Sequence, residues 1–216
     1  MTPLKGDCLI HLTTPSGIVV GRDESRLDNI TAWIMGNLDL AGKAVLDVGS
    51  NVGHFPIVYG QMGAKVVAVE PRVEIVDQFQ TLLDDHFCGL DVRILCQEMR
   101  QVDYAAIGPV EVLSTLGLIY HLNEPWLALE PILKACRPSI WLLESCLWGT
   151  THTSDEGGPE GMATLAYVTE RVLRPTAEDV EKGILSLGYK FRRIDLGPTY
   201  KSENGSPRGF WLCVPA

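Results

Sequence analysis

The chain has 216 residues, 46% of them hydrophobic and 21% charged, which is enough apolar material for one sizeable domain with a buried core. Its net charge of −9 disfavours binding to bare nucleic acid. The absence of an 18-residue apolar run disfavours a membrane span, and an N-terminus without signal-peptide features disfavours secretion. Six cysteines without a Cys-x-x-Cys pair disfavour a metal site and a disulfide framework, and they favour a cytoplasmic location.

The hydrophobic pattern predicts strands that alternate with helices along most of the chain. The expected strands are 44–48, 65–70, 92–96, 110–115 and 140–145. The expected helices are 26–38, 53–62, 72–86, 101–106 and 125–136. Such alternation is typical of a mostly parallel sheet with helices on both faces.

The C-terminal part departs from this alternation. The glycine-rich stretch 149–161 predicts a surface loop, which either closes over a bound substrate as a lid or is a passive insertion. A helix is expected at 176–187, with Thr176 as its N-cap and Gly188 ending it. Two strands, 189–194 and 209–214, are close enough in sequence to pair antiparallel.

Together these elements predict an α/β fold with a seven-stranded, mostly parallel, Rossmann-like sheet and an antiparallel C-terminal strand. We expect residues 1–216 to form a single domain. In that domain an N-terminal helical segment, 1–40, and the region 149–175 would shape a substrate pocket.

A glycine-spaced turn follows the first strand of this alternation, in the stretch VLDVGSNVGHF (45–55). Gly49 and Gly53 are present, but Ser50 and Asn51 stand where a dinucleotide-binding loop has its middle glycine. The second strand ends at Glu70, 21 residues after Gly49. A carboxylate there is placed to accept hydrogen bonds from both hydroxyls of a ribose.

The order of strand, Asp47, Gly49, Gly53 and Glu70 resembles the class I S-adenosylmethionine (SAM) methyltransferases over about residues 40–148. The resemblance implies SAM as cofactor and S-adenosylhomocysteine (SAH) as product. It implies that the turn, with Ser50 and Asn51, holds the methionine part of SAM. Glu70 and the adjacent Pro71 would then hold the ribose.

Two later segments extend the resemblance. CQEMR places Glu98 near the adenine amine and Met99 against the ring, although a glutamate in a solvated loop is an equal alternative. LSTLGLIYHLNEPWLALEPIL resembles the tRNA-wobble carboxymethyltransferases and many small-molecule methyltransferases. That similarity implies that Leu116 and Tyr120 lie beside the sulfonium and that His121 faces the substrate.

The acceptor side is less defined by the sequence. WLLES, which resembles the family's fifth strand, places Glu144 at the pocket rim, and Trp148 and His152 are further candidates to bind substrate. Tyr120 and His121 are the candidate catalytic residues, because a histidine that titrates near neutral pH can accept a proton from a hydroxyl. The alternatives are that His121 only bonds its own loop, that His152 is simply solvated, and that transfer relies on proximity alone.

One group of arginines is a candidate source of a carboxylate or phosphate anchor: Arg171, Arg174, Arg192, Arg193 and Arg208. The stretch 22–43 lacks a residue-by-residue match to the lysine and tryptophan with which the carboxymethyl-transferring relatives grip their modified cofactor. Ordinary SAM is therefore expected.

The leading hypothesis is a cytoplasmic SAM-dependent methyltransferase acting on an oxygen or nitrogen of a small molecule. A tRNA base methyl- or carboxymethyltransferase, a non-catalytic SAM-binding protein and a nicotinamide-dependent reductase are the alternatives. The sequence defines neither the acceptor nor the oligomeric state.

Overall fold

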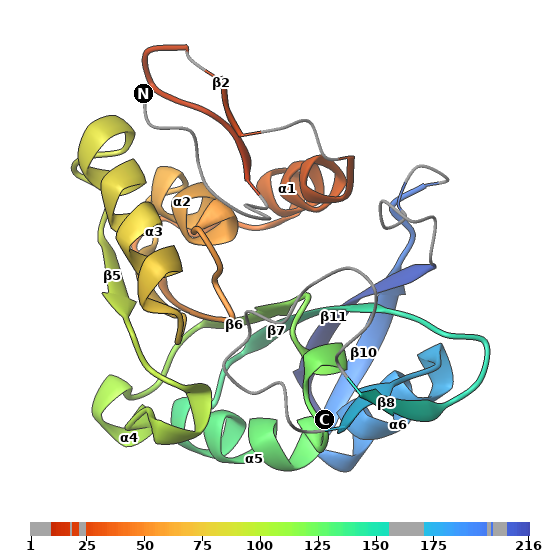
Figure 1. Ribbon diagram of the computed structural model, residues 1–216. Helices are drawn as coiled ribbons and strands as arrows, with labels where there is room; N and C mark the ends of the chain where they lie inside the picture. The colour runs from red at the N-terminus through yellow and green to blue at the C-terminus, as the bar shows by residue number, and fades with distance from the viewer. Residues whose placement is uncertain (1–9, 18, 22–24, 156–170, 198–199, 201–206) are drawn as a thin grey trace.

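A seven-stranded sheet forms the centre of the computed structural model, which describes residues 10–17, 19–21, 25–155, 171–197, 200 and 207–216 (Figure 1). The strands are β3 (Ala44–Val48), β4 (Lys65–Val69), β5 (Val92–Leu95), β6 (Val112–Leu116), β7 (Ile140–Cys146), β10 (Tyr189–Ile194) and β11 (Arg208–Pro215). Their spatial order is β10-β11-β7-β6-β3-β4-β5. All pairings among β3 to β7 are parallel, whereas β11 runs antiparallel to both β7 and β10. The predicted sheet, with its antiparallel C-terminal strand, is confirmed.

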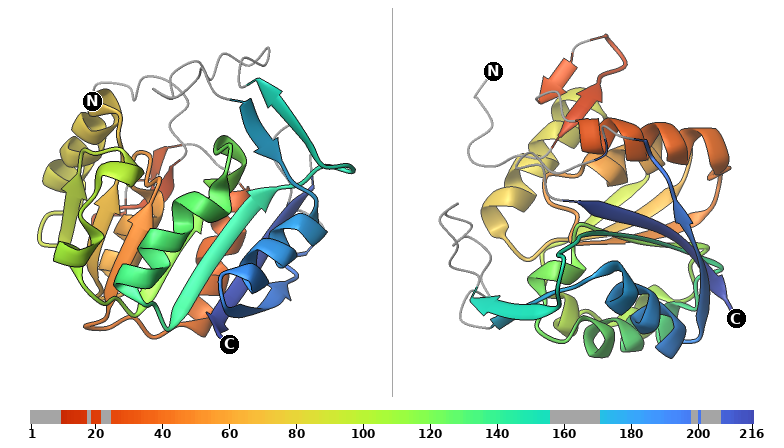
Figure 2. Two further views of the ribbon diagram at one scale, coloured as in Figure 1. Left: turned by 90° about the horizontal axis from the view of Figure 1, so that it is seen from below. Right: turned by 90° about the vertical axis from the view of Figure 1, so that its right-hand side faces the viewer.

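Helices cover both faces of this sheet, as the alternation predicts (Figures 1 and 2). On one face lie α1 (Ser25–Asn37), α2 (His54–Gln61) and α3 (Val73–His86), and on the other α4 (Tyr104–Ile107), α5 (Pro125–Cys136) and α6 (Ala177–Ser186). Each fits its expected position, and Thr176 caps α6 in a reciprocal pair with Asp179.

Neighbouring residues of the central strands pack into different cores. In β7, Leu142 packs into a cluster with helix α1, whereas Leu143 packs into a cluster with α5 and α6. Phe210 and Trp211 of β11 divide in the same way, and all four side chains are fully buried. This is the two-residue period of a strand that is buried on both faces.

Two small hairpins were not predicted. β8 (His152–Asp155) pairs antiparallel with β9 (Arg171–Arg174), so the expected loop 149–161 is wrong for its first part. The partner of β8 lies remote in sequence, and its residues HTSD are all polar, so they give no alternating apolar pattern. Residues 156–161, the second part of the candidate lid, lie outside the described part of the chain. In the N-terminal segment, β1 (His11–Thr13) pairs with β2 (Val19–Gly21) ahead of the expected helix.

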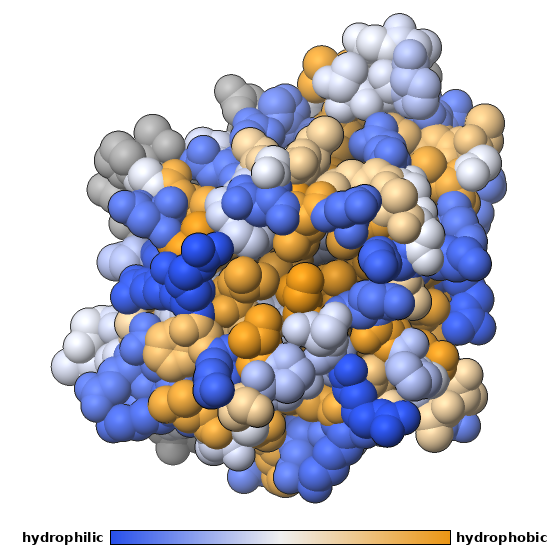
Figure 3. Space-filling model, turned by 180° about the vertical axis from the view of Figure 1, so that it is seen from behind, coloured by the Kyte–Doolittle hydropathy of each residue, from blue (hydrophilic) through white to orange (hydrophobic). Residues whose placement is uncertain are grey.

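The two ends of the parallel strands have different surroundings. Figure 1 views the sheet from the carboxyl ends of its parallel strands, and the turns that follow these strands lie on this side. Figure 3 shows the opposite face, where apolar side chains gather around a central hollow and hydrophilic ones surround them.

Gly53 is the position in the glycine turn at which a side chain is least tolerated. Its φ is +88°, and an added Cβ would lie 2.0 Å from Cε2 of Phe79, a fully buried ring of α3. We expect Gly53→Ala to lower the free energy of unfolding by about 2–4 kcal/mol, because strain and overpacking add. Urea denaturation measures this loss.

Gly36→Ala is the matched control, because Gly36 lies in helix α1 and an added Cβ would meet no neighbouring atom within 4 Å. There alanine should leave stability unchanged or raise it by up to about 1 kcal/mol. An equal loss in both variants would contradict the packing argument.

Candidate functional site

The candidate site is built from segments that follow the carboxyl ends of four adjacent parallel strands. The glycine turn follows β3, the loop with Glu70 follows β4, a short 3-10 helix η2 (Ile119–His121) lies after β6, and Trp148 follows β7. Because carboxyl ends of parallel strands meet at one edge, these segments lie on the same side of the sheet (Figure 2).

The glycine turn has three residues in the left-handed region. Gly49 has φ +81°, Asn51 φ +49° and Gly53 φ +88°. Asparagine tolerates this region better than most residues with a side chain, which explains how the turn forms with Asn51 at its centre. At Gly49 an added Cβ would approach Cδ1 of Leu118 to 3.1 Å, so the loops after β3 and β6 are closely packed here.

The five backbone N–H groups of residues 49–53 all donate within the protein. Those of Gly49 and Ser50 donate to Val69 O at 2.9 and 3.1 Å, and that of Asn51 donates to Glu70 Oε2 at 3.0 Å. The last two donate inside the turn itself. A pyrophosphate needs such N–H groups to be available, so the turn suits a ligand without phosphate.

Glu70 lies beside this turn and is 2% exposed. Besides the N–H of Asn51, its carboxylate accepts hydrogen bonds from three nitrogens of Arg72. The backbone N–H and Nε of Arg72 donate to Oε1 at 3.1 and 2.6 Å, and Nη2 donates to Oε2 at 3.2 Å. Glu70, the predicted ribose acceptor, therefore forms a bidentate ion pair with Arg72. This ion pair was not predicted from the sequence.

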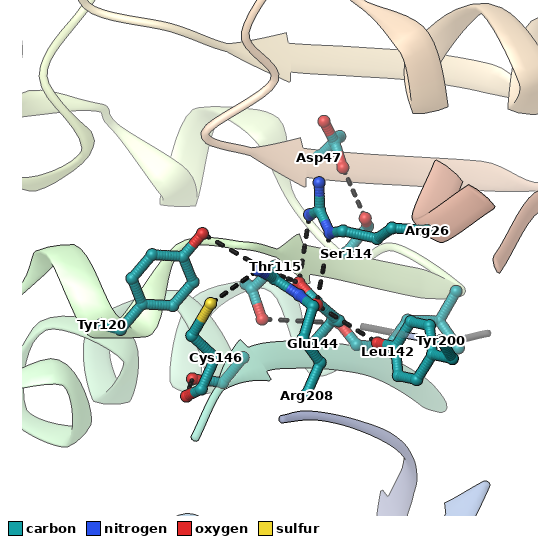
Figure 4. Close-up of polar contacts among 11 residues, drawn as sticks. Arg26, Asp47, Ser114, Thr115, Tyr120, Leu142, Glu144, Cys146, Tyr200 and Arg208 are labelled. Carbon is teal, nitrogen blue, oxygen red and sulfur yellow. Dashed lines mark hydrogen bonds and ion pairs between the residues drawn. The ribbon is translucent and has the colours of Figure 1, made fainter. Parts of the chain in front are cut away.

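Asp47 lies beneath the turn, at the base of a buried chain of hydroxyl groups. Tyr59 Oη donates to Ser114 Oγ at 3.0 Å, and Ser114 Oγ donates to Asp47 Oδ1 (Figure 4 shows the second contact). Burial raises the pKa of Asp47 to about 7; the hydrogen bond from Ser114 lowers it, and the charge of Glu70 raises it further. Asp47 therefore exchanges its proton near neutral pH.

The candidate adenine contacts lie after β5, next to Glu70. The backbone N–H of Glu70 donates to Leu95 O at 3.1 Å, which brings the two loops together. Glu98 accepts the backbone N–H of Arg100 at 2.9 Å, and Met99 is buried. Pro71, which stands between Glu70 and Arg72 in the sequence, is half-buried. Their roles toward adenine stay predictions.

Glu144 is the centre of a buried ionic cluster (Figure 4). Its predicted place at the pocket rim is wrong, because the residue is 0% exposed. Arg26 donates to its two oxygens from Nε at 3.3 Å and Nη2 at 3.1 Å. Arg208 also donates from two nitrogens, Nη2 at 2.9 Å, and Tyr200 Oη donates at 3.2 Å. Burial opposes ionisation, but the charges of Arg208 and then Arg26 outweigh it and hold the pKa of Glu144 at about 2.

This cluster also sets the position of Tyr120. Arg208 Nη2 donates to Tyr120 Oη at 3.2 Å, and the guanidinium lies 5.4 Å from the centroid of the Tyr120 ring. Gly117 permits the close approach of Arg26, because an added Cβ would lie 2.7 Å from Arg26 Nη2. Glu144 therefore joins α1, β11 and the loop after β6 through its two arginine partners.

Four candidate residues of the acceptor side form an aromatic group. The ring of Tyr120 lies 4.2 Å from that of His121 and 6.2 Å from that of Trp148, and Trp148 lies 6.4 Å from His152, all between centroids. Arg174 lies 5.0 Å from the Trp148 centroid and donates to Tyr120 O at 3.0 Å. Leu116, the remaining candidate, is buried at the end of β6 and belongs to the apolar cluster that includes helix α1.

The two candidate catalytic residues differ in electrostatic environment. Burial raises the pKa of Tyr120, although Arg208 opposes the effect, so its phenol stays protonated at neutral pH. A protonated phenol does not accept a proton from a nucleophile. His121, which is half-buried, is consequently the better candidate for a base.

Arg26, Arg72 and Tyr200 were not predicted from the sequence, and Arg208 was predicted only as one of five candidate anchors. The signal for Arg72 was present, because it stands two residues after Glu70. Arg26 and Tyr200 lie 118 and 56 residues from Glu144, and no local pattern connects them. Within the described part of the chain there is no group of three metal-ligating side chains and no helix long and apolar enough to cross a membrane.

The arrangement of sheet, helices and loops is the class I SAM-dependent methyltransferase fold, and solved structures of such enzymes superpose on it. The N-terminal domain of EvdMO1 with SAH and D-fucose matches with a TM-score of 0.72 at 17% identity, covering 93% of this chain and 88% of that one. No family model and no curated protein sequence matches the chain.

Two further matches have the same fold. Magnesium protoporphyrin IX methyltransferase from Synechocystis PCC 6803 with bound SAM has a TM-score of 0.65 at 15% identity, covering 88% of this chain and 78% of that one. The 1,6-didemethyltoxoflavin-N1-methyltransferase of Burkholderia thailandensis, with its substrate and SAH, has a TM-score of 0.63 at 15% identity, covering 89% and 79%. At these identities the likeness establishes the fold.

Asp47→Asn should remove a pH dependence of stability. On folding, the pKa of this carboxyl group rises from 3.8 to about 7, so its protonation favours the folded state. This stabilisation of the fold is complete below pH 3.8 and is lost as the pH rises through about 7. The difference amounts to about 4 kcal/mol at most. The free energy of unfolding of the wild type minus that of Asp47→Asn should therefore fall between pH 4 and 8. A constant difference over that range would contradict a buried, proton-exchanging Asp47.

Glu144→Gln should destabilise the fold, because it leaves two buried guanidinium groups around a neutral amide. We expect a loss of about 3–5 kcal/mol in the free energy of unfolding. Glu130→Gln is the control, since Glu130 pairs with Lys134 at 2.8 Å on the exposed face of α5. That variant should change stability by less than about 0.5 kcal/mol. Equal effects in urea denaturation would remove the special role assigned to Glu144.

Proposed function

We propose that the chain is a SAM-dependent methyltransferase that transfers the methyl group to an oxygen or nitrogen of a small molecule. The observation that carries the proposal is the buried Glu70 carboxylate held against the glycine turn, with Asn51 N 3.0 Å from Oε2, in a fold that SAM-binding enzymes share. It supports the proposal because a carboxylate suited to accept ribose hydroxyls and a turn suited to close approach of a ligand lie side by side at the carboxyl edge of the sheet.

The residues present fit SAM better than a dinucleotide. The turn 49–53 has its N–H groups engaged internally, which agrees with a ligand whose methionine part carries no phosphate. In this proposal Glu70 and Pro71 hold the ribose, and Glu98 and Met99 hold the adenine. Bound SAM supplies an electrophilic methyl group on a positively charged sulfur.

The protein's own contribution is to align the acceptor, exclude water and take up a proton where the nucleophile carries one. Leu116 and Tyr120 border the transfer position, with Tyr120 held by Arg208 at 3.2 Å. His121 takes the proton of a hydroxyl acceptor. Trp148, which packs beside Tyr120, and His152, which packs beside Trp148, cover the acceptor and keep water out.

A small-molecule acceptor is favoured over tRNA by the net charge of −9. It also agrees with neighbours whose structures hold D-fucose or 1,6-didemethyltoxoflavin. The free cysteines, two of them exposed, agree with a reducing cytoplasm. A protein that binds SAM without transferring its methyl group remains the second candidate, because the cofactor half of the site supports binding alone.

Transfer of a labelled methyl group tests the proposal. The protein is incubated with SAM carrying a radioactive methyl group and with a library of hydroxyl- and amine-bearing metabolites, in parallel with bulk tRNA. We expect label in a small-molecule product and none in tRNA. Calorimetric binding of SAM without any labelled product would favour the binding protein, and binding of NAD but not SAM would reject the proposal.

Glu70→Ala should weaken SAM binding by about 1.5–3 kcal/mol, because two charge-assisted hydrogen bonds to the ribose are lost. Glu74→Ala is the matched control, since Glu74 lies exposed in the first turn of α3, four residues along. Titration calorimetry on both folded variants measures the difference. Unchanged affinity in Glu70→Ala would mean that this carboxylate is not the ribose acceptor.

A further inference from the structure

Arg72 occupies the carboxylate to which the proposed function assigns the ribose. It stands at the N-cap of α3, and its Nε and Nη2 reach the two oxygens of Glu70 at 2.6 and 3.2 Å. The Arg72 side chain is 15% exposed, whereas that of Glu70 is 2% exposed. The ion pair thus has one partner fixed inside the protein and one at its edge.

The hydrogen-bonding capacity of Glu70 is already filled. A carboxylate offers about four acceptor positions, two on each oxygen. Main-chain N–H groups of Asn51 and Arg72 take one on each oxygen, at 3.0 and 3.1 Å. The guanidinium of Arg72 takes the other two, again one on each oxygen.

The two positions held by the guanidinium are the ones that a ribose requires. Vicinal 2′- and 3′-hydroxyls present two donors to the two oxygens of one carboxylate, which is the same bidentate demand that Nε and Nη2 satisfy. The main-chain donors belong to the glycine turn and to the start of α3, so the backbone fixes them. The guanidinium and the ribose hydroxyls therefore compete for the same lone pairs.

We propose that Arg72 is a displaceable occupant of the ribose subsite and thereby sets the affinity for the cofactor; the inference rests on the proposed function. When the ribose binds, the guanidinium leaves Glu70 and enters solvent. The helix need not move, because the first turn of α3 is held by main-chain bonds from Ile75 and Val76 to Arg72 O. The population in which Arg72 is detached is the binding-competent one, so its scarcity lowers the apparent affinity.

Removing the competing side chain should tighten binding. We expect Arg72→Ala to bind SAH roughly 3- to 10-fold more tightly than the wild type, because every molecule then has Glu70 available. Arg72→Lys, which offers a single ammonium in place of a two-nitrogen fork, should lie between them. Arg93→Ala on the exposed edge of β5 removes the same charge without touching Glu70 and should bind SAH like the wild type.

An SAH analogue without the 2′- and 3′-hydroxyls separates competition from a general electrostatic effect. This analogue makes no demand on Glu70, so Arg72→Ala should bind it no more tightly than the wild type does. A gain of the same size for SAH and the analogue overturns the proposal. So does unchanged or weaker SAH binding by Arg72→Ala, once its thermal unfolding shows that it is folded.

The side chain can also be followed directly. The Nε–H resonance of Arg72, identified by its absence from the spectrum of Arg72→Lys, should be protected from exchange in the free protein and lose that protection when SAH is added. Retained protection in the complex overturns the proposal even where Arg72→Ala proves unstable. Failure of the proposed function looks different: the wild type would bind neither SAM nor SAH, and Glu70→Ala would change nothing.

Discussion

One buried carboxylate, that of Glu144, joins segments that are far apart in the sequence. Arg26 comes from the helix ahead of the sheet and Arg208 from the last strand, and both direct two nitrogens at the same two oxygens. Isolated buried charges are costly, so each of these groups is tolerable only when the others are in place. The packing of α1 and the position of β11 are therefore coupled at one point. Through Arg208 the same point holds Tyr120, which borders the proposed transfer position. The proposed acceptor side of the site thus depends on the ionic cluster as well as on the loop that carries its residues.

The proposed cofactor side of the site follows a different principle. Its turn is formed by local backbone conformation at Gly49, Asn51 and Gly53, and its hydrogen bonds run to the neighbouring strand and to Glu70. These features are close in sequence or lie on adjacent strands, so they need few long-range partners. One half of the site is therefore specified by a short stretch of chain and the other by contacts between distant segments. This division agrees with a fold in which a common cofactor is combined with varied acceptors.

The same division explains how much could be predicted from the sequence. Strands such as β3 and β6 are apolar runs bounded by turn residues, and α6 begins at a capping Thr176, so the sheet and its helices were predicted closely. Glu70 was found because its distance from Gly49 along the chain reflects one strand–turn–helix–strand unit. Glu144 was assigned to the pocket rim because WLLES resembles the family's fifth-strand segment. Its burial depends on Arg26 and Arg208, and no pattern in a single sequence pairs residues 118 and 64 positions apart.

Arg72 shows a further limit of motif-based prediction. A motif identifies Glu70 as an acceptor of hydrogen bonds, but it does not say which donor holds that acceptor when the ligand is absent. A buried carboxylate must be satisfied in both states, since leaving it unpaired costs more than a typical hydrogen bond contributes. Those donors that the ligand replaces have to be given up on binding, and the affinity is the difference between the two sets of bonds. An arginine two residues away meets the requirement at little conformational cost, because its side chain reaches back over a single turn of chain. Residues next to a binding carboxylate thus influence affinity through the free state, even where they make no contact in the complex.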